Sequence, residues 1–440
     1  MSVGSTEEIH RLHKINLRNL RNLWTQIAWT FATRLLMIFN SVAAGIIVAH
    51  WLGAKGVGEL AVINVTVATL VQLGSFGLPS SNTYFIAKDQ ARFRSAALNS
   101  LFFALFVGSL LSLALSAIAA SRPDWVGFAS GELIRIAAFS IPFQMITLIG
   151  LNILLAVGRV REFNVLDLAG QSFVLINAVC VWRLIKGDLA VLVIWNTIAS
   201  VLVSFAVVTT IVISGKKLLQ SKWRLDGALL RRMIGYGLKF HVSILAGAII
   251  IRADLLVVSY FRGAAEAGVY SVASQFALLL MLLPGVIATL LFPRVTAEQD
   301  ARGETTCRVT RYTAFIMFLC CIAAVPFSLV LPLIYGSAFT DATGLLLILL
   351  PGVYLMGLES VLVQHFNATG LPRAIPLYWV ATLALNLVLV FTLVPRYGAV
   401  GAAVASTISY AAIFALVALH FQTSTGRSFS EVFVLGSLRG

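Results

Sequence analysis

Charged residues are scarce in this sequence. Only 11% of its 440 residues are Asp, Glu, Lys or Arg, whereas 59% are hydrophobic and the mean hydropathy is +0.93. An ordinary soluble domain carries about a quarter charged residues. The shortage of charge therefore excludes an ordinary soluble protein and predicts an all-α, polytopic membrane protein.

Recognisable catalytic and metal-binding motifs are also absent. The sequence contains no GxxxxGK[ST], GxSxG or HExxH pattern, and its four cysteines show no CxxC spacing. The polar connections between its apolar segments are too short to hold a soluble catalytic domain. We therefore expect a protein that is not an enzyme and holds neither metal nor cofactor. Its energy would come from substrate flux, the membrane potential or a coupling ion such as Na⁺ or H⁺.

Twelve apolar runs are long enough to cross a hydrocarbon core of about 30 Å. They lie at residues 24–51, 58–87, 95–120, 132–157, 163–184, 189–214, 234–261, 267–292, 310–335, 342–367, 374–395 and 399–421. The sequence therefore predicts twelve transmembrane helices. Residues 1–23 are polar and basic and lack the apolar stretch of a cleaved signal peptide, so we expect them to form a cytoplasmic tail.

Basic residues are concentrated on one side of this predicted topology. Most of the 32 Lys and Arg residues lie in the N-terminal tail, in alternate connections, and in the tail at residues 422–440. By the positive-inside rule, this asymmetry places both termini in the cytoplasm. We attribute the net charge of +14 to topology and to contacts with anionic lipid, and expect no nucleic-acid partner.

The predicted helices fall into two equal halves. A basic cytoplasmic linker at residues 215–233 separates an N-lobe at residues 24–214 from a C-lobe at residues 234–421. The residues around the C-terminal end of the first helix are similar in the two halves and lie at a constant distance from each other along the sequence, which indicates an internal repeat. The matching pairs are Val48/Val258, Gly53/Gly263, Ala54/Ala264, Gly58/Gly268 and Val62/Val272. Six helices per half make the repeats parallel, which places any central pathway between the two lobes.

Several charged residues lie deep within the apolar runs. Placing Arg, Lys or Asp at the middle of a membrane helix costs about 2.5–3.5 kcal/mol, so such residues rarely face lipid. Two interpretations remain open. The charges form structural ion pairs, for example Arg34 or Arg252 with Asp254 or Glu359, or they line a solvated cavity in which guanidinium groups bind phosphate. The candidate substrate-binding residues are Arg34, Ser41, Arg135, Gln144, Lys239 and Arg252. The candidates for ion coupling or structural pairing are Asp167, Asp254, Glu359 and Asn386.

The orientation of these side chains follows partly from helix geometry. Arg252 and Asp254 are two residues apart, and two residues turn an α-helix by about 200°, so they cannot pair directly. We expect Arg252 to face the cavity between the lobes and Asp254 to face a partner within the C-lobe. Thr30, Arg34 and Ser41 share one polar face of the first helix, which we expect to line water or the other lobe.

Four segments of the chain resemble those of a known group of membrane proteins. They read IIVAHWLGAKGVGELAVI, LGSFGLPSSNTYFIAK, YGLKFHVSILAGAIIIRADLLVVSYFRGAAEAGVYSVA and LNLVLVFTLVPRYGAVGAAVAS. In their order along the chain, they resemble the Wzx-type polysaccharide-biosynthesis flippases of the multidrug/oligosaccharidyl-lipid/polysaccharide (MOP) exporter superfamily. The resemblance implies a MATE-like fold of two six-helix lobes. It also implies flipping of an undecaprenyl-diphosphate-linked O-antigen, capsule or exopolysaccharide unit across the bacterial inner membrane by alternating access.

The resemblance also implies roles and partners. Arg34 corresponds to a first-helix cation that meets the diphosphate, and Arg252 with Asp254 corresponds to a charged seventh helix. Polysaccharide polymerase and glycosyltransferases are the protein partners that such a transporter would have. Two other functions remain open, a cation-coupled multidrug antiporter of the same superfamily and a non-transporting scaffold for polysaccharide enzymes. Against the antiporter, a cationic interior should repel a cationic drug.

Overall fold

The computed structural model describes residues 4–121, 130–217, 223–298, 300, 302–370 and 372–433, and within these ranges it consists of helices and short connections. The α-helices are α1 (Gly4–Gly74), α2 (Leu78–Lys88), α3 (Phe93–Ser121), α4 (Gly131–Ala138), α5 (Ile141–Ala156), α6 (Val160–Cys180), α7 (Leu189–Lys217), α8 (Gly227–Arg262), α9 (Ala264–Leu279), α10 (Leu282–Glu298), α11 (Glu304–Ser328), α12 (Leu331–Tyr335), α13 (Ala342–Thr369), α14 (Ala374–Thr425) and α15 (Phe429–Phe433). Shorter helical turns are η1 (Gln90–Arg92), η3 (Val181–Ile185) and η4 (Ser337–Phe339). The prediction of an all-α protein is confirmed.

The helices are those of a multi-pass membrane protein. Within the described ranges, nine helices are long and apolar enough to cross a membrane, or ten if α4 and α5, which meet at 41°, count as one span. Two of the nine are too long for a single crossing. The apolar part of α1 has 46 residues and α14 has 52, against about 20 residues for one span.

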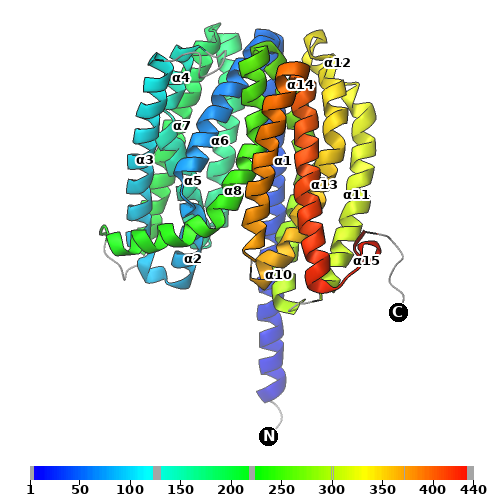
Figure 1. Ribbon diagram of the computed structural model, residues 1–440. Helices are drawn as coiled ribbons and strands as arrows, with labels where there is room; N and C mark the ends of the chain where they lie inside the picture. Colours follow the sequence, from blue (N-terminus) through cyan, green and yellow to red (C-terminus); the bar gives the residue numbers. More distant parts are fainter. Residues whose placement is uncertain are drawn as a thin grey trace.

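Both long helices turn back at a glycine. Gly53 in α1 has φ 66° and ψ −173°, and Gly398 in α14 has φ 59° and ψ −137°, so each interrupts the helical backbone. Figure 1 shows α14 as two stretches that lie side by side, orange and red. Positive φ is accessible to glycine because it has no Cβ. The turns lie where the sequence separates two apolar runs, and the total of twelve crossings stays a prediction.

Several predicted runs are interrupted, which the periodicity alone did not indicate. The run at 58–87 is broken before α2, and the runs at 132–157, 267–292 and 310–335 each divide into two helices. In each case a proline stands in the first turn of the helix after the break: Pro79 in α2, Pro142 in α5, Pro284 in α10 and Pro332 in α12. Proline lacks an N–H and is tolerated at the start of a helix, where that group has no intrahelical acceptor.

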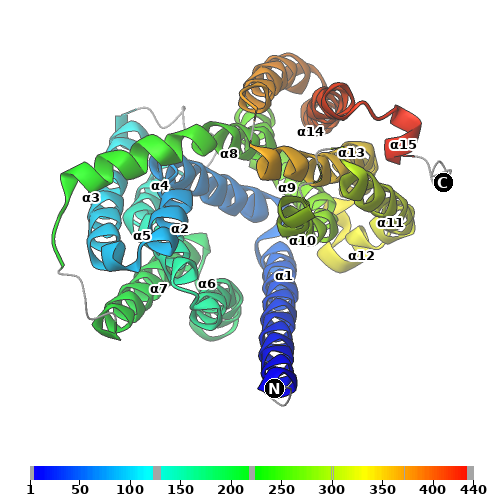
Figure 2. The ribbon, with the colours of Figure 1, turned by 90° about the horizontal axis from the view of Figure 1, so that it is seen from below.

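The helices form two groups joined by α1 and α8. Figure 2 shows α2–α7 gathered on one side and α9–α15 on the other, with α8 running across both. Helix α1 contacts both groups. Its Asn40 donates a hydrogen bond to Ser172 of α6 at 2.9 Å, and its Ser41 accepts one from Gln275 of α9 at 3.0 Å.

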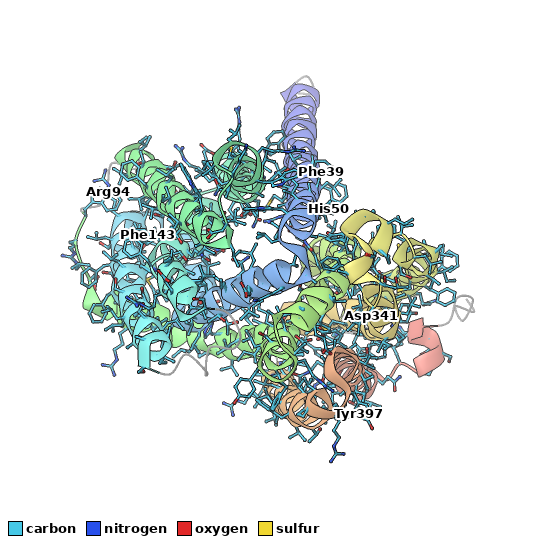
Figure 3. All side chains as sticks on the ribbon, turned by 90° about the horizontal axis from the view of Figure 1, so that it is seen from above. Phe39, His50, Arg94, Phe143, Asp341 and Tyr397 are labelled. Atoms are coloured by element: carbon cyan, nitrogen blue, oxygen red, sulfur yellow. The ribbon has the colours of Figure 1, made fainter. Side chains whose placement is uncertain are left out.

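The ends of the described chain lie on one side of the bundle. Figure 1 shows the N-terminal part of α1 and helix α15 at the lower end, whereas the turns of α1 and α14 lie at the upper end. Figure 3 looks onto that upper end, where His50 and Tyr397 lie close to these turns. His50 Nε2 is 2.7 Å from the carbonyl oxygen of Ile334, which ties α1 to the chain around α12. Residues 1–3 and 434–440 of the predicted tails lie outside the described residues.

Helix α8 begins within the predicted linker and is anchored to the first group. Its N-cap residue Asp226 accepts a hydrogen bond from the Leu229 N–H at 2.9 Å, and the Asn99 side chain pairs with the Asp226 backbone at 2.8 and 3.0 Å. The Ser81 hydroxyl of α2 donates to the Met233 carbonyl at 2.6 Å. The predicted linker at residues 215–233 is therefore partly helical, and its residues 218–222 lie outside the described part of the chain.

The two groups touch at a symmetric crossing of α1 and α9. A Cβ on Gly58 would lie 1.7 Å from the Ala264 carbonyl oxygen, and a Cβ on Gly268 would lie 2.0 Å from the Ala54 carbonyl oxygen. These four residues form two of the repeat pairs found in the sequence. The preceding pair, Gly53 and Gly263, also shares a positive φ. The repeated motif thus builds the same turn and the same close backbone approach in both halves.

This crossing predicts a specific sensitivity to side-chain volume. Gly58→Ala should lower the free energy of unfolding by about 1–3 kcal/mol, because the new methyl group forces backbones apart. Gly344→Ala is the matched control, since Gly344 lies in a helix with open space around its Cβ position. Thermal unfolding of the detergent-purified protein measures both. Equal melting temperatures for Gly58→Ala and the wild type would contradict the tight crossing.

Candidate functional site

A cavity of about 720 Å³ lies between the two groups of helices. Its polar lining comes from α1, α6, α7, α8 and α9 and includes both of the arginines that lie deepest in the apolar runs. The polar residues are Arg34, Ser41, Asn64, Gln171, Asn196, Arg252, Tyr270, Ser271, Ser274 and Gln275. Arg34 approaches from α1 and Arg252 from α8. Of the predicted polar face of the first helix, Arg34 and Ser41 line this cavity, whereas the Thr30 hydroxyl instead accepts a hydrogen bond from Asn164 of α6.

A second cavity of about 620 Å³ adjoins the first within the α1–α7 group. The two share Ser41, Gln171, Asn196 and Arg252 among their lining residues. Gln144 and Asp167 line only the second cavity. Five of the residues singled out from the sequence are thus brought to one continuous interior region: Arg34, Ser41, Gln144, Asp167 and Arg252.

Arg34 is paired and still accessible. Its guanidinium lies 2.9 Å from the Asp167 carboxylate of α6, and its side chain is 40% exposed. The guanidinium also lies 5.7 Å from the centre of the Phe163 ring. The ion pairs of Arg34 with Asp254 or Glu359 considered from the sequence are not formed within the described residues. Instead the pair joins α1 to α6 inside one helix group and leaves part of the guanidinium open to the cavity.

Arg252 is the cation contributed by the long bridging helix. It lines both cavities and forms no ion pair with any residue that the structure describes. A guanidinium carries five N–H donors, and leaving a charge without a partner in an apolar environment is unfavourable. Its position beside a polar cavity gives it access to water or to an anionic ligand.

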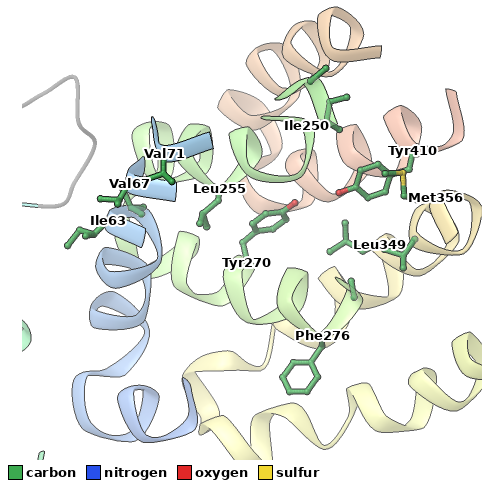
Figure 4. Packing of buried hydrophobic residues seen from close by; sticks show 14 of the residues in the cluster. Ile63, Val67, Val71, Ile250, Leu255, Tyr270, Phe276, Leu349, Met356 and Tyr410 are labelled. Carbon is green, nitrogen blue, oxygen red and sulfur yellow. The ribbon is translucent and has the colours of Figure 1, made fainter. Parts of the chain in front are cut away.

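Asp254 points away from Arg252 into the second helix group. The residue is 1% exposed, and its carboxylate accepts hydrogen bonds from the Tyr270 hydroxyl and from the Ser406 hydroxyl at 2.7 Å. The Leu255 N–H also donates to it at 2.7 Å. Figure 4 shows the Tyr270 and Tyr410 hydroxyl groups turned toward each other in this region. The expected orientation is therefore correct, and the partners of Asp254 are hydroxyl groups of α9 and α14.

The remaining acidic and amide candidates are buried elsewhere in the same group. Glu359 of α13 is 1% exposed, and its Oε1 has no hydrogen-bond partner within the described residues. Asn386 of α14 is fully buried and donates to the Ser409 hydroxyl at 3.1 Å. Neither lines the two cavities. Their roles in coupling or pairing stay predictions.

Two predicted substrate-binding cations lie apart from the cavities. Arg135 is exposed and lies in the last turn of the short helix α4. Lys239 is exposed on α8 and lines a separate pocket beside α2. The structure thus separates them from Arg34 and Arg252, and their part in binding substrate stays a prediction.

Other lining residues were not singled out from the sequence. Gln275 donates to Ser41 across the two groups, and Asn196 accepts a hydrogen bond from Asn177 at 2.9 Å. Ser271, Ser274 and Gln275 share one helical face because they are three and four residues apart. This polar face within an apolar run is the sequence pattern from which these cavity residues could have been predicted.

Comparison with known proteins identifies relatives whose names refer to the biosynthesis or transport of polysaccharides and other glycans. The profile of the family described as "Polysaccharide biosynthesis protein" matches residues 58–343. A putative O-antigen transporter of Shigella flexneri is 26% identical over 184 residues, which are 40% of this chain and 44% of the relative. A probable low-salt glycan biosynthesis flippase of Haloferax volcanii is 23% identical over 187 residues, which are 41% of this chain and 40% of the relative. The chain spans less than half the length of these relatives, and neither is named as an enzyme.

Solved structures show the same fold at low sequence identity. The lipid II flippase MurJ in an inward closed conformation matches with a TM-score of 0.74 and 16% identity over 93% of this chain and 89% of that one. An inward-facing multidrug resistance MATE family transporter of the MOP superfamily matches with a TM-score of 0.72 and 15% identity, over 91% and 98% of the two chains. The expected MATE-like fold is confirmed, and the family match agrees with the expected resemblance to polysaccharide-biosynthesis proteins.

The buried Asp254 site predicts a cost for removing one donor. Tyr270→Phe should lower the free energy of unfolding by about 1–3 kcal/mol, because it leaves a buried carboxylate with one hydrogen bond fewer. Tyr312→Phe is the control, since Tyr312 is 57% exposed. Thermal unfolding in detergent compares the two variants. A loss of equal size in both would show that the hydrogen bond to Asp254 contributes nothing of its own.

Proposed function

Since the chain belongs to the polysaccharide biosynthesis protein family, we propose that it is a flippase for lipid-linked glycans. Its substrate would be an undecaprenyl-diphosphate-linked repeat unit of an O-antigen, capsule or exopolysaccharide. Its place would be the bacterial inner membrane, where it would move the polar head from the cytoplasmic to the outer leaflet. The names of the curated relatives support this proposal.

One observation carries the proposal. Arg34 and Arg252 reach the same cavity of about 720 Å³ from two different helices. A guanidinium binds phosphate oxygens through paired N–H donors, which gives both charge and geometric complementarity. Ionisable groups inside a membrane are unfavourable without a partner. Arg252, which has no ion-pair partner among the described residues, and the partly exposed guanidinium of Arg34 therefore favour an anionic substrate. The lipid tail would stay in the bilayer while the diphosphate and sugars cross.

The arrangement of the helix groups supports alternating access. The close crossing at Gly58 and Gly268, which follows the turns at Gly53 and Gly263, holds the groups together. In the proposed cycle, the groups, corresponding to the lobes at residues 24–214 and 234–421, rock about such crossings and expose the cavity to each side in turn. The bound diphosphate would compete with Asp167 for the partly exposed guanidinium of Arg34.

Energy and partners form a further part of the proposal. Asp254 and Glu359 are buried carboxyl groups in the second helix group, and they would exchange Na⁺ or H⁺ during the cycle. Polysaccharide polymerase and glycosyltransferases would act on the same glycan on either side of the membrane. The cation-coupled multidrug antiporter is less well supported. Among the described residues, Asp167 is the one acidic residue that lines either cavity, and it is already paired with Arg34.

The proposed topology has twelve crossings and cytoplasmic termini. A green fluorescent protein fused after Gly440 should fluoresce, and alkaline phosphatase fused there should be inactive, because folding of each reporter depends on its compartment. Fusions after Gly53, in the turn of α1, should give the reverse pattern. Active phosphatase at Gly440 would contradict the proposed orientation.

Removal of either cavity arginine should block transport. Arg34→Ala and Arg252→Ala should each lower the rate of repeat-unit flipping about ten- to hundredfold, because each removes charge-assisted hydrogen bonds to phosphate. The measurements are surface polysaccharide and lipid-linked repeat units on the cytoplasmic side, in cells with matched protein levels.

Two further variants sharpen this experiment. Arg34→Lys and Arg252→Lys retain the charge but lose the forked donor geometry, so they should restore part of the activity. Arg161→Ala removes the same group from an exposed position of α6 outside both cavities and should leave export close to the wild-type level. Normal surface polysaccharide in both cavity variants would overturn the proposed function.

A further inference from the structure

A third pocket lies outside the cavities, between α2 and the first turns of α8. It has a volume of about 740 Å³. The residues that matter for its chemistry are Tyr84, Lys88, Arg92, Arg232, Tyr236 and Lys239. Figures 1 and 2 both show α2 beside the first part of α8, at the end of the bundle toward which the N-terminal part of α1 projects.

The charges around this pocket are unbalanced. Four cationic residues line it, against the single carboxylate of Asp89. That carboxylate is already engaged by Arg92 at 2.8 Å. Lys88, Arg232 and Lys239 form no ion pair with any residue in the described part of the chain. The pocket therefore presents three uncompensated positive charges to a ligand.

One wall of the pocket is aromatic. The rings of Tyr84 and Tyr236 stack with their centroids 4.4 Å apart and an interplanar angle of 15°. The Lys88 ammonium lies 5.7 Å from the centre of the Tyr84 ring. Tyrosine places an apolar ring beside a polar hydroxyl, which suits the boundary between lipid and water. The site therefore combines anion binding with contacts to the apolar part of a ligand.

The two elements are held rigidly against each other. A Cβ on Gly77 would lie 2.4 Å from the Gly237 carbonyl oxygen, so the backbones are in close contact. The Ser81 hydroxyl bonds to the Met233 carbonyl on the buried side of α8, while Arg232 and Lys239 are exposed. The cationic side chains therefore extend from two helices whose backbones are packed tightly together.

The pocket lies where α8 meets the membrane. Beyond Lys239, the described stretch His241–Arg262 of α8 is long and apolar enough to span a bilayer, whereas Arg231, Arg232 and Lys239 precede it. A lipid headgroup lies at the same depth as this boundary. A free phosphate in solution would not need the aromatic wall.

We propose that this pocket binds the phosphate headgroup of a membrane lipid, with Arg232, Lys239 and Lys88 contacting the phosphate and the tail remaining in the bilayer. Two lipids carry this chemistry, an anionic phospholipid and an isoprenyl diphosphate. Only the second rests on the proposed flippase function, for which the pocket would be a docking site outside the transport cavity.

The full-length protein in nanodiscs of phosphatidylcholine tests the proposal. The probes are farnesyl diphosphate and a fluorescent phosphatidylglycerol, each titrated separately. Arg232→Gln should weaken binding of the probe that fits the pocket about fivefold, and Arg232→Gln combined with Lys239→Gln about thirtyfold, at roughly 1 kcal/mol per interfacial charge. Arg231→Gln is the matched control. It removes the same charge from the next residue, which is exposed but does not line the pocket, and should leave the affinity unchanged.

The two probes identify the lipid. Charge-dependent binding of farnesyl diphosphate that excess phosphatidylglycerol does not displace assigns the pocket to an isoprenyl diphosphate, and the opposite preference assigns it to a phospholipid. Equal losses in Arg231→Gln and Arg232→Gln, or no loss in the double variant, would overturn the proposal, since surface charge alone would then explain binding. The readout is binding rather than export, so failure of the proposed flippase function would leave this result standing.

Discussion

The fold depends on one constraint, that polar groups inside a membrane need partners or water. Each embedded charge meets this constraint in a different way. Arg34 pairs with Asp167 and keeps part of its guanidinium in a cavity, whereas Asp254 is enclosed by hydroxyl and backbone donors. Arg252 has neither kind of partner among the described residues and faces the cavities. The placement of charge thus separates a buried carboxylate in one helix group from the arginines at the polar cavity between the groups.

Backbone contacts determine how the two groups meet. At Gly58 and Gly268 the chain of each group lies against a carbonyl of the other, and no larger side chain fits without a shift. The same motif provides the turn before each contact through Gly53 and Gly263. A local sequence repeat therefore acts at the level of tertiary structure. It supplies two equivalent surfaces that pack against each other, which a pair of unrelated segments would achieve only by coincidence.

Helix α8 extends from the surface pocket, which Lys239 lines, to the cavities, which Arg252 lines. Its first turns are fixed to α2 and α3 through Ser81 and Asn99, and its later turns carry Arg252. Motion between the two groups would therefore require α8 to bend or to shift as a unit. A lipid bound near Lys239 would contact the same helix that lines the cavity. Binding of lipid in the surface pocket and relative motion of the two groups would therefore both act on α8.

The sequence by itself determined the membrane class, the approximate limits of the helices, the internal repeat and the opposite orientations of Arg252 and Asp254. These follow from hydropathy, glycine positions and the rotation of a helix, which are local properties. Only the tertiary structure decided that Asp167 pairs with Arg34 and that Lys239 lies apart from them. Such pairings join residues distant in the chain, and a helical face shows which side chains point together without showing which helix lies opposite. The breaks before α2 and α5 lie between these two classes, because Pro79 and Pro142 mark them in the sequence, but a proline within an apolar run is compatible with either a kink or a complete break.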